Sequence, residues 1–357
     1  MAIKSKDNGT LNWNHESSKR NVSFDYLKGI GILLMMVCHL VGEHNQIVYS
    51  FHMPLFFFLA GYFAKTQYPP QQNYSQLKKD AKRLILPFVV TMLMLCLWGG
   101  VQAVMKHDWM LSLRYPLSLL WASGDAIRSE KYGLIYAGPM WFLIALFWIR
   151  EIFYYGAGWI LSKTKGDEAR GDKIVVGVSI LISVGAMLLH PLVQPLPFCL
   201  FQGFAAIEFY AIGWYAHRHK IPMWVKVLCI VCWPLAIMWG GLELESCVYV
   251  CYPLDVLGAC GAVLVLYQLC DWVSKGIQKL FPAAYTTHQT FLQWIGINSL
   301  AILCMHTFDL NSGMIYSFLC RLPFEVSAPI LVVVRMMLAI GLAWLVTMLP
   351  GLRKVYR

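Results

Sequence analysis

Ten runs of about twenty mainly apolar residues recur along this chain of 357 residues. Apolar residues make up 58% of it and charged residues 13%, whereas charged residues are about a quarter of a typical soluble domain. Because an α-helix needs about 20 apolar residues to cross a bilayer, each run predicts a membrane-spanning helix. The expected spans are 24–43, 47–65, 84–105, 138–158, 174–190, 198–217, 224–243, 248–270, 291–308 and 328–349. The sequence therefore predicts an all-α, polytopic integral membrane protein with about ten transmembrane helices.

The distribution of positive charge predicts the orientation of these helices. Most of the 29 Lys and Arg residues fall before the first span, in alternate loops and after the last span. Such segments face the cytosol, so we expect a cytosolic tail at 1–22, a membrane domain at 23–350 and a cytosolic tail at 351–357. The first twenty residues are polar and do not resemble a cleaved signal sequence. Topology and anionic lipid headgroups explain the net charge of +10, so no nucleic-acid partner is expected.

The first predicted span carries an unusual polar stripe. Lys28 and His39 are eleven positions apart, which on an α-helix places them within roughly 20° of one another and about 16 Å apart along the axis. Asp25 lies one turn before Lys28, and Glu43 lies one turn after His39. Four polar groups on one face of an apolar helix predict a functional site or a very polar neighbour.

Other ionisable residues also fall at membrane depth, where each is a functional candidate that needs a partner. A tight connection after the first span places His39 and His52 at similar depth, across one cleft. Asp255 and Arg335 lie at similar distances from the outer surface, which would allow them to pair. Glu208, near mid-membrane, is interpreted either as a proton relay or as the partner of a polar neighbour.

Metal and redox chemistry are not expected. His39, His52 and His306 are predicted at similar depth, but no HxxxH or HExxH spacing supports a zinc site. His306 alone is interpreted either as a structural hydrogen-bond donor or as a site residue. The eleven cysteines fall mostly inside predicted spans, which is typical of buried thiols.

Two loops offer further groups for ligands. The inner loop before the third span carries a basic cluster that suits phosphates, although snorkelling membrane anchors give the same pattern: Lys78, Lys79, Lys82 and Arg83. The outer loop 106–137 carries aromatic residues that suit either a sugar or the membrane interface: Trp109, Tyr115, Trp121, Tyr132 and Tyr136.

Six segments then follow one another along the chain: FDYLKGIGILLMMVCH (24–39), SFHMPLFFFLAGYFAK (50–65), KRLILPF (82–88), PMWFLIALF (139–147), FYAIGWY (209–215) and GINSLAILCMH (296–306). In this order they resemble the acyltransferase-3 family of membrane acyltransferases, most closely its fucose 4-O-acetylase-like branch. The resemblance extends from about residue 22 to about residue 350.

The resemblance implies a ten-helix domain of the bacterial cytoplasmic membrane. Its expected activity is the transfer of an acetyl group from cytosolic acetyl-CoA, a co-substrate, to a sugar hydroxyl of a cell-surface polysaccharide or of its lipid-linked precursor, without a metal. The expected partners are the glycan acceptor, the lipid bilayer and polysaccharide-assembly proteins. No further domain is expected after the last span, so the acceptor is handled by the membrane domain or by a separate partner.

The resemblance and the polar positions together give a candidate site. The family signature of a basic residue, ten intervening residues and a histidine maps onto Lys28 and His39, although Arg is the commoner basic residue. His39 is the expected general base, or less favourably an acyl carrier, with Glu43 orienting its ring and His52 or Asn298 stabilising the oxyanion. The candidate catalytic residues are His39, His52 and Glu43, the cofactor-binding residues are Lys28, Lys82 and Arg83, and the substrate-binding residues are Trp141, Asn298, His306 and Glu208.

Two alternatives come from other classes of protein. A transporter or flippase for glycans or small solutes explains Glu208, Asp255 and Arg335, but not the pairing of Lys28 with His39. An enzyme depends on acyl-CoA and leaves a new ester, whereas a transporter moves unmodified solute. A sensor or structural partner of a polysaccharide assembly machine is the third possibility.

Overall fold

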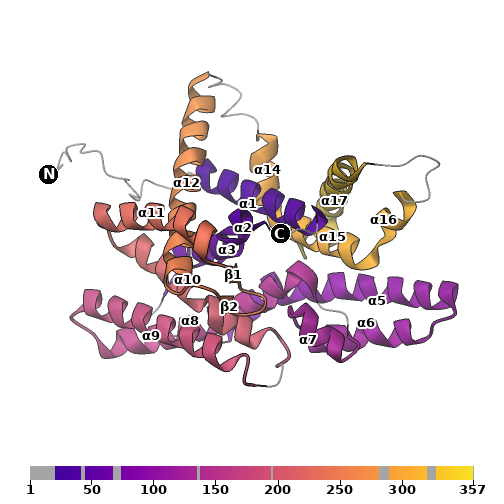
Figure 1. The fold of residues 1–357 in the computed structure, drawn as a ribbon, viewed down its shortest axis with the longest axis horizontal. Coiled ribbons are helices and arrows are strands. Elements are labelled where there is room, and N and C mark those ends of the chain that lie inside the picture. The colour runs from indigo at the N-terminus through magenta and orange to yellow at the C-terminus, as the bar shows by residue number, and fades with distance from the viewer. Residues whose placement is uncertain are drawn as a thin grey trace.

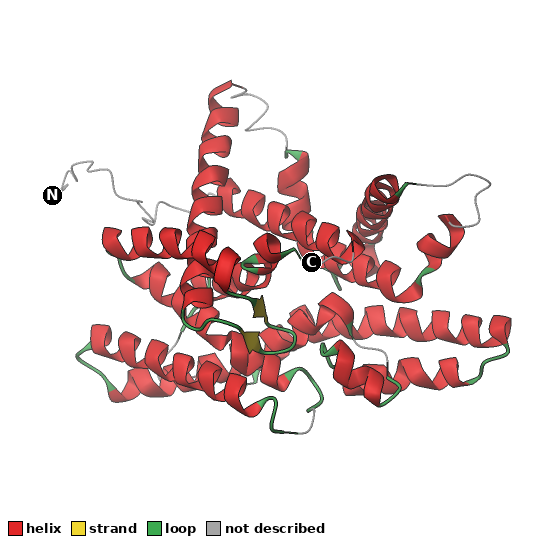
Figure 2. Cartoon of the chain, in the orientation of Figure 1, coloured by secondary structure: helices red, strands yellow, loops and turns green. Residues whose placement is uncertain are grey.

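The structure, a computed structural model, describes residues 21–41, 45–66, 74–134, 137–193, 196–280, 289–319 and 327–356. Helices dominate these residues, and one short hairpin contributes their two strands (Figures 1 and 2). The predicted all-α class is therefore confirmed.

The first half of the chain contains helices α1 (Val22–Val41), α2 (Gln46–Tyr49), α3 (His52–Tyr62), α4 (Ser75–Asp80), a π-helical turn (Ala81–Ile85), α5 (Leu86–Lys106), α6 (Met110–Trp121), α7 (Ala126–Lys131), a 3₁₀ turn (Gly138–Met140), α8 (Trp141–Lys163) and α9 (Glu168–Leu189). The second half contains α10 (Leu200–Arg218), α11 (Met223–Trp239), β1 (Leu242–Glu243), β2 (Val248–Tyr249), α12 (Leu254–Leu280), α14 (Phe291–Ile297), α15 (Ser299–Ser312), α16 (Met314–Leu319), α17 (Ala328–Met348) and α18 (Pro350–Arg353).

Within the described ranges, six helices are long and apolar enough to cross a membrane. They are α1, the continuous helix Ser75–Lys106, the helix Gly138–Lys163, α9, α12 and α17. The pair α14 and α15 makes a seventh candidate, bent by 79°. A multi-pass membrane protein is confirmed, while the count of ten spans and the cytosolic termini stay predictions.

Helix α10 is an interior helix and is not among these candidates. It packs against α3, α8 and α9, and most of its residues are buried. Its backbone touches that of α3 closely, because a Cβ at Gly61 would stand 1.9 Å from the Tyr210 carbonyl oxygen. Small residues at such crossings allow helices to approach in a membrane. The contact fixes α3, whose first residues, His52 and Met53, face the site described below.

Helix α1 is fixed in a similar way by α14. A Cβ at Gly296 would stand 1.8 Å from the carbonyl oxygen of Asp25, so only glycine permits this crossing. The two helices meet near the centre of Figure 1.

The predicted outer loop 106–137 contains a helix, α6, which packs against α5 (Figure 1). Its Tyr115 is buried, and the hydroxyl donates a hydrogen bond to the carbonyl oxygen of Asn311 at 3.2 Å. Trp109 and Tyr132 are exposed. None of these three aromatic residues lines either cavity described below, so the sugar interpretation of this loop gains no support, and Tyr136 lies outside the described residues.

The predicted pairing of Asp255 with Arg335 is wrong. Arg335 pairs with Asp309, whose Oδ2 is 2.8 Å from its Nη2 and 2.9 Å from its Nε. Asp255 accepts backbone N–H groups of Gly241 and Cys251, each at 2.8 Å. Helix α15 packs directly on α17 and brings Asp309 to the arginine, whereas Asp255 lies in the first turn of α12 and binds the backbone of the connection before it.

Candidate active site

The polar stripe lies on one uninterrupted helix. Helix α1 runs from Val22 to Val41, so Lys28 and His39 share it as predicted. The Lys28 Nζ is 3.1 Å from the Oδ1 of Asp25, one turn earlier, and this carboxylate is buried. Near the other end, His39 is half-buried. The two ends of the stripe face two different cavities.

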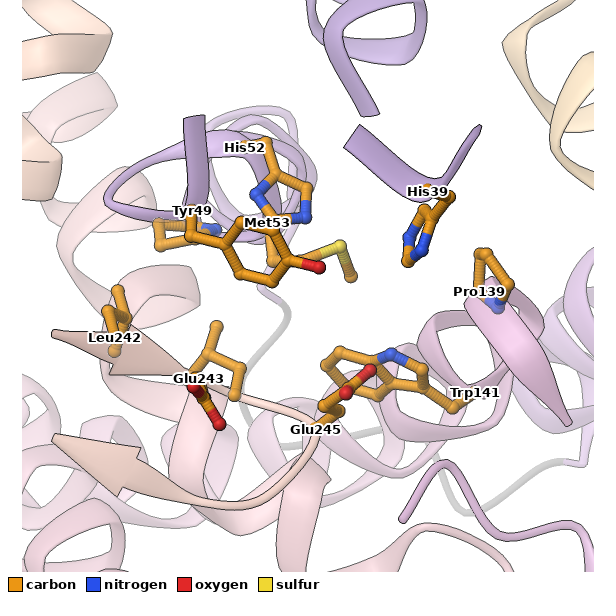
Figure 3. Close-up of a pocket in the computed structure, with 11 residues that line it drawn as sticks. His39, Tyr49, His52, Met53, Pro139, Trp141, Leu242, Glu243 and Glu245 are labelled. Atoms are coloured by element: carbon orange, nitrogen blue, oxygen red, sulfur yellow. The ribbon is translucent and has the colours of Figure 1, made fainter. Parts of the chain in front are cut away.

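His39 faces a cavity of ≈ 20 Å³, which we call the histidine cavity (Figure 3). Such a space holds about one water molecule. Helix α1, the α2–α3 segment, the start of α8 and the β-hairpin each contribute to its wall. The lining residues are His39, Tyr49, His52, Met53, Pro54, Pro139, Trp141, Leu242, Glu243, Leu244 and Glu245.

His52 enters this cavity with one nitrogen already engaged. Its Nδ1 lies 3.0 Å from the carbonyl oxygen of Val48, so Nδ1 carries the proton and donates it. A neutral His52 then has no second N–H group, and the predicted role as an oxyanion donor does not suit it. Tyr49, whose ring packs edge-on at 5.0 Å, brings a hydroxyl to the same cavity.

His306 lies behind His39. Their ring centroids are 6.1 Å apart, and His306 is completely buried. Neither ring nitrogen of His306 has a hydrogen-bond partner among the residues that the structure describes. His306 is not part of the cavity wall, so its geometry suits packing against His39 better than contact with a substrate.

Lys28 faces a second and larger cavity of ≈ 440 Å³, which we call the basic cavity. Its wall contains five cationic side chains, Lys28, Lys65, Lys79, Arg83 and Arg150, and its described wall contains no Asp or Glu. The remaining wall is largely apolar and aromatic. A pocket with this division suits a ligand that carries several negative charges at one end and an apolar or amide chain at the other.

Local structure explains how two of these cations are placed. Arg83 belongs to the π-helical turn Ala81–Ile85, a conformation that is rare and often found at functional sites. Arg150, on α8, is held by the buried Asp80, since its Nη2 is 2.8 Å from the Asp80 Oδ1.

The two cavities share part of their walls. Met53 and Pro139 line both of them. Between Lys28 and His39, Ile32 and Met35 also face the basic cavity, at the three- and four-residue spacing of one helix face. A ligand that lies along α1 from Lys28 therefore points at His39.

Several predicted site residues are not brought into either cavity. Lys82 is exposed and Asn298 donates its side-chain N–H to the Trp294 carbonyl oxygen at 2.9 Å, although the next residue, Ser299, does line the basic cavity. Glu43 lies outside the described residues.

Glu208 occupies a separate buried cluster. It accepts hydrogen bonds from the Ser183 hydroxyl at 2.9 Å and from the Tyr252 hydroxyl at 3.1 Å. The second of the two sequence interpretations, a carboxylate partnered by polar neighbours, describes this geometry.

The structure also adds residues that the sequence did not select for the site. Glu243 and Glu245 come from the hairpin, a segment that falls at the edge of two predicted spans and bears no motif. Burial, together with the neighbouring carboxylates of Glu243 and Asp125, raises the pKa of Glu245 to about 7. Arg150 had one signal in the sequence, a charge inside a predicted span.

Comparison with known protein families agrees with the resemblance. An acyltransferase domain, that of the acyltransferase-3 family, matches residues 21–348, which is nearly the whole chain. The chain therefore belongs to this family and is a membrane acyltransferase. No curated protein and no solved structure matches it.

Proposed function

We propose that this acyltransferase is an O-acetyltransferase of a bacterial cytoplasmic membrane, and that it moves an acetyl group from acetyl-CoA to a sugar hydroxyl of a cell-surface polysaccharide or its lipid-linked precursor. The observation that carries the proposal is the basic cavity, which meets a histidine-lined cavity at Met53 and Pro139. Assignment to the fucose 4-O-acetylase-like branch is part of the same proposal.

The basic cavity supplies what the donor needs. Acetyl-CoA carries phosphates at one end and a long pantetheine arm that ends in the thioester. Lys28, Arg83 and Arg150 form charge-assisted hydrogen bonds to the phosphates, while the arm follows Ile32 and Met35. The rise of an α-helix separates Lys28 from His39 by about 16 Å, a length that an extended arm covers.

His39 then acts as the general base. Its neutral imidazole takes the proton of the acceptor hydroxyl while the hydroxyl oxygen attacks the thioester carbonyl carbon. The C–S bond breaks, the CoA thiolate takes the proton from the imidazolium, and the products are the O-acetyl ester and free CoA. The Tyr49 hydroxyl and the Trp141 indole N–H, both in the cavity wall, are the donors that we assign to the developing oxyanion.

The transporter alternative is less well supported. The residues that it would use for protons or solute, Glu208, Asp255 and Arg335, have partners of their own and line neither cavity. A transporter also has no need of acyl-CoA.

The test uses membranes that contain the full chain, radiolabelled acetyl-CoA and the glycans of the native cell. Wild type should place base-labile label on glycan or glycolipid, and H39A should not. H107N is a matched control, because His107 lies outside both cavities and its left-handed backbone, with φ at 51°, tolerates asparagine. Label that persists in H39A would show that His39 is not the general base. Absence of label with wild type would contradict the proposed function.

A further inference from the structure

The β-hairpin is built to hold its turn against the histidine cavity. Its strands pair Leu242 with Tyr249 and Glu243 with Val248. In the turn, Leu244 is buried in the core, and the side chain of Gln202 donates a hydrogen bond to the backbone oxygen of Glu245 at 2.9 Å.

This anchoring places the carboxylate of Glu245 at the cavity wall. In Figure 3, Glu245 and Glu243 reach the cavity from the hairpin side, while His39 reaches it from α1 on the opposite side. Among the described residues, the Glu245 carboxylate has neither a hydrogen-bond partner nor an ion-pair partner. A partly buried carboxylate without a partner costs stability, and such groups gather at functional sites.

Asp255 shows that this connection is able to satisfy a carboxylate. Both of its oxygens accept backbone N–H groups, from Gly241 and Cys251. Glu245 differs from Asp255, because no described residue gives its carboxylate a hydrogen bond, and the carboxylate is therefore available to a ligand.

The charges around Glu245 limit the charge that such a ligand can carry. Glu243 lies in the same wall, and Asp125 is close enough to interact with Glu245 electrostatically. His190 lies 3.6 Å from the Asp125 carboxylate, and the described lining residues include no Lys or Arg. An acceptor with its own negative charge at this point would be repelled, whereas a hydroxyl would donate a hydrogen bond.

We propose that Glu245 binds the acceptor, accepting a hydrogen bond from a hydroxyl next to the one that His39 deprotonates, and that with Glu243 it selects an uncharged sugar over an acidic one. This inference rests on the proposed function and names the class of its acceptor. Glu245 is a binding residue here, and the transfer step itself remains with His39.

The experiment compares two soluble probes, methyl glucoside and methyl glucuronide, which differ by a carboxylate. Purified full-length protein in liposomes receives saturating radiolabelled acetyl-CoA and either probe, and in parallel the ester-bearing sugar of the native glycan is identified by mass spectrometry. The variants are E245A, E245Q and the control E168Q, whose exposed carboxylate lies on α9 outside both cavities.

We expect at least a tenfold preference of wild type for the glucoside, a tenfold or larger rise in its KM in E245A, and a tenfold or larger loss of the preference in E245Q. CoA binding should stay unchanged, and E168Q should behave like wild type. If the enzyme acetylates neither probe, the test rests on the native glycan. An ester on an uncharged sugar of that glycan, lost in E245A, supports the inference. Equal use of both probes, wild-type behaviour of E245A and E245Q, or an ester on an acidic sugar would overturn it. If wild type forms no ester at all, the proposed function is contradicted. This result differs from the results above, in which the ester forms but the role of Glu245 is contradicted.

Discussion

The basic cavity and the histidine cavity lie at the two ends of one helix face, yet they differ in size and in charge. The first measures ≈ 440 Å³ and has five cations and no acid in its described wall. The second measures ≈ 20 Å³, and its described lining residues include two glutamates and two histidines but no Lys or Arg. Under the proposed function, a polyanionic donor would be attracted to the basic cavity only, with its reactive end toward His39.

The largest expected effect concerns the chemistry of the small cavity. H39A should lower acetyl transfer by about a thousandfold, since a general base typically contributes 10² to 10⁴ in rate. The affinity for CoA, measured by calorimetry on the purified protein, should change by less than about threefold because the basic cavity is intact. A comparable loss of CoA affinity would show that donor binding and acetyl transfer are not separated between the two cavities.

Closing the boundary between the cavities should have the next largest effect. Met53 lines both, so M53W should place an indole across their shared wall and lower transfer by about a hundredfold, within the range that misplacement of reacting groups costs. CoA binding should fall much less than transfer. M105W is a useful comparison, because Met105 on α5 is exposed and lines neither cavity. Full activity in M53W would mean that the donor reaches His39 by another route.

Removal of single cations from the basic cavity should act on donor binding. K28A and R83A should each raise the KM for acetyl-CoA by about 10- to 100-fold, since a hydrogen bond to a charged group is worth about 1.5–3 kcal/mol. The control is K82A, which changes the neighbouring lysine outside the wall. Initial rates over a range of acetyl-CoA concentrations measure this, and an unchanged KM in both variants would place the phosphates elsewhere.

The smallest expected effect is on stability. The pKa of Glu245 is raised to about 7 in the folded protein, from about 4.3 in an unfolded chain, so the folded state binds more protons between these values and loses stability as pH rises through this window. E245Q should therefore raise the Tm in detergent at pH 8 by a few degrees and leave it unchanged at pH 4. Thermal unfolding at both pH values measures the difference. A lower Tm for E245Q at pH 8 would show that the charged carboxylate stabilises the fold.

The sequence predicted those features that depend on periodicity along one helix. The stripe from Asp25 through Lys28 to His39 needed only the 3.6-residue repeat, and α1 has that form. It predicted less well what depends on contacts between distant segments. Asp309 lies on a helix that packs against α17, so the partner of Arg335 was decided by packing that no local pattern encodes.

The hairpin shows a second limit of sequence patterns. Two strands of two residues each, between long apolar helices, have too short an alternation to be recognised, and they bring Glu243 and Glu245 to His39 across about two hundred residues of chain. Glu208 shows that depth in the membrane leaves two interpretations open, a site residue or a partnered carboxylate. Contacts with the distant Ser183 and Tyr252 fit the second, and Glu208 lines neither cavity.

The most direct test of the central claim is a cryo-EM structure of the full chain with a non-hydrolysable acetyl-CoA analogue. We expect the phosphates beside Lys28, Arg83 and Arg150, the arm along Ile32 and Met35, and the carbonyl carbon next to His39 at the shared wall of the two cavities. Phosphates bound outside the basic cavity, or a carbonyl carbon directed away from His39, would contradict the account.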